Sequence, residues 1–159
     1  MNEFIDPELD VLPKLLIELR DDPVVSSIVG DRVRGKEPEG PLLNAAGEEV
    51  EPGDVRGPGE YVPFVVLSRL GGPPHARVPI VTARISIRCY GRSDREAAVL
   101  RNACSRALHG KGPRTFANGL GIYVSHDVTG GQQDSDPDTS QPLESFVVEA
   151  VASTQPVVV

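Results

Sequence analysis

The stretch that decides the fold is Val81-Thr82-Ala83-Arg84-Ile85-Ser86-Ile87-Arg88-Cys89-Tyr90, in which apolar and polar side chains alternate. Successive side chains of a β-strand point to opposite faces of a sheet, so this alternation predicts a two-sided strand. Every odd-numbered side chain falls on an apolar face, and every even-numbered one, including Arg84 and Arg88, falls on the opposite face. The apolar face can pack on a helix, whereas the arginine face has no obvious helix to cover it.

A sharply bounded helix is predicted directly after this strand, from Ser93 to His109. Ser93-Asp94-Arg95-Glu96 is a capping box, in which the serine hydroxyl and the glutamate carboxylate each accept a hydrogen bond from an otherwise unpaired backbone N–H group. The apolar residues at helical spacing that mark its buried side are Ala97, Leu100, Cys104, Ala107 and Leu108. We expect this stripe to pack on the apolar face of strand 81–90 and Gly110 to end the helix.

The charges of the chain are segregated along the sequence. Residues 61–115 contain ten basic and two acidic side chains, a net charge of +8, whereas residues 1–60 carry −9 and residues 116–159 carry −6. One basic segment between two acidic ones suits a protein that meets copies of itself or ordered neighbours, so the pattern favours assembly over catalysis. The overall charge of −7 argues against tight binding to bare nucleic acid, because phosphate contacts need a positive surface.

Residues 1–159 are expected to form a single α+β domain. Asp6-Pro7 opens a first helix, and Asp22-Pro23 opens a second short turn or helix that stops at Gly30. The first helix carries an apolar stripe of Leu9, Leu12, Leu15, Leu16 and Leu19. Further strands are expected at 32–34, 61–67, 121–125 and 143–152.

The order of these elements predicts an antiparallel or mixed sheet of four to five strands, with two main helices packed on one face and long loops. Segment 35–60 is rich in Gly, Pro and Glu, and segment 129–142 is polar and acidic, so both are expected to be flexible loops. The C-terminal tail, 153–159, is too short to fold alone.

The cysteines and histidines do not form a recognisable metal site. Cys89 and Cys104 fall on apolar faces and are expected to act as small buried hydrophobes; a disulfide between them would suit an oxidising compartment. His75, His109 and His126 lack the spacing of a helical metal site, and His109 suits the negative end of a helix dipole. We therefore expect no metal and no cofactor.

No catalytic residues are expected either, because the chain contains no nucleophile elbow and no phosphate-binding glycine loop. Asp134-Ser135-Asp136-Pro137-Asp138 resembles a calcium loop only loosely, since Pro137 interrupts it and the required glycine and glutamate are missing. The N-terminal residues lack the pattern of a secretory signal, and no apolar run approaches the length of a membrane span. We expect folding in a cytoplasm and no membrane partner.

The row of arginines has two interpretations. Arg84 and Arg88 could simply keep an exposed sheet face soluble, or they could meet acidic loops of a neighbouring subunit, such as 35–60 or 129–141. Charge complementarity of the second kind fixes partner and register more than it adds affinity. The candidate subunit-interface residues are Arg84, Arg88, Arg92, Glu49, Glu51, Asp134 and Asp136.

The order of several short phrases resembles a known family. A leucine-rich helix precedes Asp-Asp-Pro-Val-Val-Ser-Ser-Ile-Val-Gly-Asp-Arg-Val (21–33), and Val-Pro-Phe-Val-Val-Leu (62–67) follows. Arg-Ile-Ser-Ile-Arg-Cys-Tyr-Gly (84–91) then precedes a helix that ends in Ala-Leu-His-Gly (107–110). Between about Leu9 and Val151 this order is similar to the tail terminator (tail completion, or tail-to-head joining) family of long-tailed bacteriophages.

The resemblance implies an α/β fold and a structural role rather than an enzymatic one. Members form a ring, commonly a hexamer, that caps the finished tail tube, stops its growth and presents a surface to the head connector or stopper. It implies a protein of the virion tail or neck, assembled in the bacterial cytoplasm, with itself, the tail tube protein and the connector as partners and DNA only passing through the lumen.

Two other classes stay open at this point. One is another neck protein, a head-completion adaptor or stopper, and the other is a small α+β enzyme or ligand-binding domain. The long segments 35–60 and 129–141 depart from the more compact members of the family, which leaves open whether they face tube, connector or lumen.

Overall fold

The strand at residues 80–90 lies inside one large sheet. The computed structural model describes residues 7–35, 42–43, 49–50, 61–70, 80–116, 120–137 and 140–153. The helices in these ranges are α1 (Pro7–Asp21), α2 (Pro23–Val29) and α3 (Asp94–Leu108). The strands are β1 (Val33–Gly35), β2 (Leu42–Leu43), β3 (Glu49–Val50), β4 (Phe64–Leu70), β5 (Ile80–Tyr90), β6 (Arg114–Thr115), β7 (Gly121–Asp127), β8 (Gln132–Ser135) and β9 (Pro142–Ser153).

Two long antiparallel pairings place β5 between β4 and β9. Residues 64–70 of β4 pair with residues 84–90 of β5, and the whole of β5 pairs with residues 143–153 of β9. The strand order is β1-β4-β5-β9-β7-β6, and β8 also pairs with β9. β7 occupies one half of the far edge of β9 and β8 the other half. Since β1 runs parallel to β4, the sheet is mixed.

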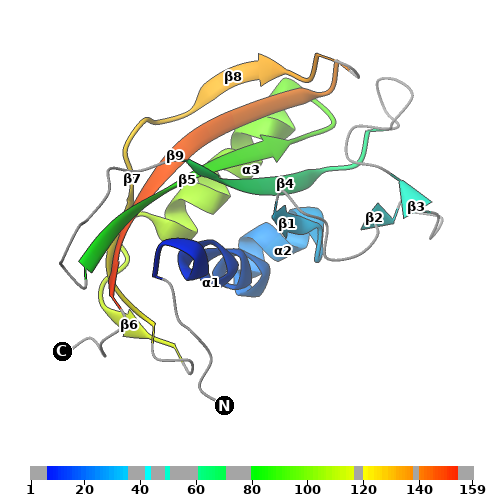
Figure 1. Ribbon diagram of the computed structural model, residues 1–159. Helices are drawn as coiled ribbons and strands as arrows, with labels where there is room; N and C mark the ends of the chain where they lie inside the picture. The colour runs from blue at the N-terminus through cyan, green and yellow to red at the C-terminus, as the bar shows by residue number, and fades with distance from the viewer. Residues whose placement is uncertain are drawn as a thin grey trace.

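All three helices pack on one face of the sheet, which curls around them (Figure 1). The buried core between the layers comes from the odd-numbered residues of β5 and the facing residues of β4, β9, α1 and α3. Its largest fully buried members on these elements are Leu15, Leu19, Leu67, Ile85, Ile87, Leu100, Leu108 and Phe146. The predicted apolar face of strand 81–90 is thus confirmed from Ala83 to Cys89, which are buried in this core.

The predicted fold class is confirmed in its main features, but the predicted number of four to five strands was too low. The described part of the chain forms a seven-stranded sheet, with β2 and β3 pairing separately. β8 lies inside segment 129–142, which was expected to be a loop. Its four side chains are all polar and exposed, so hydrophobic periodicity could not reveal it; backbone pairing with β9 holds it.

Local sequence signals set the helix ends. The Asp22 carboxylate accepts hydrogen bonds from the backbone N–H groups of Val24 and Val25, and Gly30 ends α2 with a φ of 60°. The Ser93 hydroxyl accepts from the Glu96 N–H, as the capping box predicts. The Glu96 carboxylate instead accepts from the Arg92 N–H, one residue before the expected donor. Asp6 lies outside the described residues.

Gly91 makes the short passage from β5 to α3 possible. A Cβ atom at this position would lie 2.4 Å from the backbone nitrogen of Ala97, in the first turn of α3. Any side chain would therefore overlap backbone atoms that cannot move without shifting the helix. This contact explains how a strand and a helix separated by three residues can both pack into one core.

Candidate assembly interface

The face of the sheet that the helices do not cover carries the arginines of β5. Arg84 and Arg88 are exposed there, and half-buried Ser86 lies between them along the strand. The strand registers place Arg88 between Val66 of β4 and Ser145 of β9. We call this surface the open face. It fits the expectation that no helix would cover the arginines.

Arg84 already has a partner within the same chain. Its Nε donates a hydrogen bond of 2.8 Å to the Glu149 carboxylate on β9. The other carboxylate oxygen of Glu149 lies 3.9 Å from the Nε2 atom of His126 on β7. Arg84, Glu149 and His126 thus form a row across three strands, and the glutamate offsets part of the positive charge that the sequence placed here.

Arg88 differs from Arg84 because it makes no hydrogen bond or ion pair with any other described residue. Arg92, at the end of the strand, is exposed and lies 4.0 Å from Glu96 in the first turn of α3. Of the three predicted arginines, Arg88 is therefore the one whose charge is fully available to another molecule. An unpaired arginine favours contact with a carboxylate because its donors have fixed geometry.

The predicted acidic residues are only partly brought together with these arginines. Asp134 is exposed on β8, and its register with Leu143, which pairs with Tyr90, puts it on the open face. Asp136 is half-buried, and its backbone N–H donates to the carbonyl of Gln141. Glu49 lies in β3, opposite Leu43, and Glu51 lies outside the described residues.

An aromatic cluster closes one end of the open face. The rings of Phe64 and Tyr90 stack with centroids 4.2 Å apart and an interplanar angle of 10°. Leu143 is buried with them, and Val66 packs against the cluster. Tyr90 falls on the arginine side of strand 81–90, as the alternation predicts, but it is buried rather than exposed.

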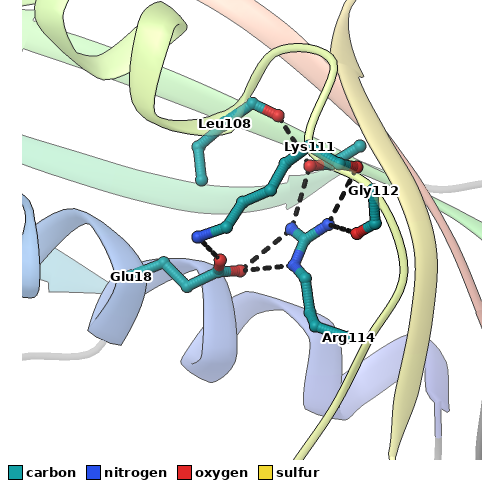
Figure 2. Close-up of polar contacts among 6 residues, drawn as sticks. Glu18, Leu108, Lys111, Gly112 and Arg114 are labelled. Atoms are coloured by element: carbon teal, nitrogen blue, oxygen red, sulfur yellow. Dashed lines mark hydrogen bonds and ion pairs between the residues drawn. The ribbon is translucent and has the colours of Figure 1, made fainter.

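A polar cluster between α1, the end of α3 and β7 was not predicted from the sequence (Figure 2). The Arg114 guanidinium donates to the Glu18 carboxylate, to the carbonyls of Lys111 and Gly112, and to the Ser125 hydroxyl. Ser125 donates in turn to the carbonyl of Leu108, and Lys111 pairs with Glu18. The cluster joins α1 to the end of α3 and to β7, so its role is structural.

Burial controls the ionisable groups of the core. Burial raises the pKa of the Cys89 thiol well above its ordinary value, and the neighbouring Cys104 thiol adds to the shift. Both cysteines are buried and reduced, as expected. Burial also lowers the pKa of the Arg32 guanidinium, whose Nε donates to the carbonyl of Pro63.

His109 lies at the C-terminal end of α3, as expected, and it also contacts β7. Its Nδ1 atom accepts a hydrogen bond of 3.0 Å from the Asp127 N–H. The residue therefore links the end of α3 to β7. His75 lies outside the described residues, and His126 belongs to the row with Glu149 described above.

The described ranges contain no group of three or more His, Cys, Asp or Glu side chains that could hold a metal ion. Within the same ranges, none of the helices is long and apolar enough to cross a membrane.

Comparison with known proteins gives one informative likeness. No protein-family model matches the chain, and no curated protein matches it. Among the solved structures that match is a chain of the virion of a native gene transfer agent particle, with a TM-score of 0.51 and 17% sequence identity. The match covers 87% of this chain and 91% of that chain. At this identity the likeness shows a shared fold.

Proposed function

We propose that this protein is a structural component of a phage-like virion, of the tail terminator type. In this role it forms a ring, as a hexamer, that caps the tail tube, stops its elongation and joins it to the head connector or stopper. DNA passes through the lumen without being bound. The observation that carries the proposal is the fold shared with a virion chain along nearly the whole length of both molecules.

The surface of the chain supports a role in assembly. A closed ring needs a heterologous interface, in which two different surfaces of one subunit meet. Segregated charge provides such surfaces, and Arg88 on the open face has no partner among the described residues. We propose that Arg88, with Arg84 and Arg92 beside it, meets acidic groups of a neighbouring subunit, with Glu49, Glu51, Asp134 and Asp136 as candidates.

Size-exclusion chromatography with light scattering, followed by negative-stain imaging of the full chain, tests this proposal. We expect a ring-sized species whose formation is promoted by tail tubes. A protein that stays monomeric at high concentration in the presence of tail tubes would overturn it. Labelling the protein in intact particles would separate a terminator, which lies at the tube end, from another neck protein on the portal side.

A further inference from the structure

We propose that the subunits of this ring meet through the helix layer, with the outer side of α3 in one copy docking onto the outer side of α1 and α2 in the next. The inference rests on the proposed function, because it adds a second contact between the subunits of the ring to the one proposed for Arg88. It concerns a different side of the molecule from the open face: α1, α2 and α3 all lie on the other side of the sheet (Figure 1).

The outer side of α3 is a narrow basic stripe with an apolar centre. Arg95, Val99, Asn102 and Arg106 are all exposed, and their spacing of three to four residues places them in one line along the helix. The buried residues of α3 lie on the opposite side. Val99 is 46% exposed in the middle of this line, with an arginine toward each end. We call these four residues the α3 stripe.

The charges of the α3 stripe are available to a partner. Neither Arg95 nor Arg106 makes an ion pair or hydrogen bond with another described residue. Asp94 is adjacent to Arg95 in sequence but projects from a different side of the helix, and Glu96 interacts with Arg92. Arg101, which lies off the stripe, is partly buried against Glu144.

The outer side of α1 and α2 has the opposite charge and two exposed aliphatic side chains. Ile17 on α1 is 45% exposed and Val24 at the start of α2 is 58% exposed. Asp21 lies between them in sequence, and Asp31 follows α2; both are exposed. We call Ile17, Asp21, Val24 and Asp31 the α1–α2 ridge.

The neighbouring arginines, Arg20 and Arg32, form no ion pair with the aspartates of this ridge. The Arg20 guanidinium donates to the carbonyl of Val33, and the Arg32 Nε donates to the carbonyl of Pro63. Both are therefore turned toward backbone oxygens of β1 and the start of β4. Neither aspartate of the α1–α2 ridge forms an ion pair with another described residue, although the charge of Asp31 acts on the neighbouring Arg32 guanidinium and opposes the lowering of its pKa.

The two surfaces match each other as the two halves of a head-to-tail contact. The α3 stripe has one exposed aliphatic side chain and the α1–α2 ridge has two, and these lose water-accessible area when the surfaces meet. Each surface also has two charges of opposite sign to those of the other. Neither surface suits contact with its own copy, since two α3 stripes or two α1–α2 ridges would repel. Complementarity between different surfaces of one chain provides the head-to-tail contact that a closed ring needs.

Two charge-reversal variants test this contact. Arg95→Glu with Arg106→Glu changes the stripe, and Asp21→Lys with Asp31→Lys changes the ridge. Each variant alone should raise the concentration needed for half-assembly about tenfold or more, because each turns attraction into repulsion. Equimolar mixing should restore assembly, because each reversed surface then meets a reversed partner in an alternating ring. Circular dichroism checks that both variants fold.

The mixture separates the specific contact from an effect of net charge. The ridge variant has a lower net negative charge than the wild-type value of −7, so general repulsion would make it assemble better rather than worse. If the wild-type chain forms rings and both variants form them equally well, or if mixing restores nothing, the proposed contact is wrong while the ring stands. If the wild-type chain forms no ring, the proposed function and the contact both fall.

Discussion

The two faces of the sheet are stabilised in different ways although they share the same strands. On the helix-covered face, Ile85 and Ile87 are fully buried against the helices. On the open face, Arg84 and Arg88 alternate with them along the same strand and are exposed. Backbone pairing is common to both faces, so the difference in side-chain contact decides where a mutation affects folding. The open face is left available for contact with another molecule.

The largest effect is expected from placing a charge on the covered face. Ile87→Asp should destabilise the protein by more than about 4 kcal/mol, because it buries a carboxylate without a partner and removes apolar contacts. The matched control is Arg88→Asp, the next residue on the open face, which should change stability by less than about 1 kcal/mol. Urea denaturation followed by circular dichroism measures both. Equal losses would contradict the distinction between the faces.

The next largest loss of stability is expected at Gly91, where the chain passes from β5 to α3. Gly91→Ala should cost about 3 kcal/mol, because its Cβ atom would overlap the backbone of Ala97 and push α3 away from the sheet. Gly112→Ala is the control, since a Cβ atom there meets nothing within 4 Å. Thermal unfolding of the two variants should show a lowered Tm for the first alone. A Gly91→Ala variant as stable as the control would show that α3 can shift freely.

A smaller loss of stability is expected from removing an ion pair, and it should differ between the helix-covered side and the open face. Glu18→Gln removes the carboxylate that pairs with Arg114 and Lys111, and only 9% of its side chain is exposed. We expect a loss of about 2 kcal/mol, because Arg114, whose side chain is only 14% exposed, stays buried and loses its counter-charge.

Glu149→Gln is the matched change on the open face, where its partner Arg84 is 51% exposed. It should cost about 0.5 kcal/mol, because solvent screens the pair. Both variants should be compared with the wild-type chain by chemical denaturation at low and at high salt. Added salt should reduce the loss caused by Glu149→Gln more than the loss caused by Glu18→Gln. The reverse order of losses would mean that the open face contributes to stability after all.

The smallest effect on folding is expected from the arginines themselves. Arg84→Glu with Arg88→Glu should change the free energy of unfolding by about 1 kcal/mol or less, since both side chains are exposed. Ring formation should weaken, because the open face would then repel acidic groups of a neighbour. Light scattering of the folded variant reads assembly directly. Unchanged assembly would remove these two residues from the interface and leave the α3 stripe as the remaining candidate.

Local patterns in the sequence predicted the central parts of the fold. Alternation over residues 81–90 and the capping residues around Ser93 depend on neighbours in the chain, so they predicted β5 and α3 within one or two residues. The pairing of Arg84 with Glu149 could not be predicted in this way, because 65 positions separate them. Glu18 and Arg114 are 96 positions apart and their contact depends on the finished packing of α1.

For the candidate interface, the sequence predicted which face of the sheet carries the arginines but not which of them lack a partner. The alternation put Arg88 on an uncovered side, and the structure shows it there without a partner among the described residues. The α3 stripe was not predicted, because Arg95 and Arg106 are ordinary residues of an amphipathic helix until the positions of α1 and α2 are known. Charge segregation along the chain was the signal that could have directed attention to them.

The position of β9 has a consequence for how the protein is made. β5, with β4 and β1 beyond it, lies on one side of β9, and β7 and β8 lie on the other. Yet residues 142–153 leave the ribosome after all of these strands. A nascent chain that stops before them lacks the strand that pairs with both halves of the sheet, so the sheet is completed only after residue 153 has been made.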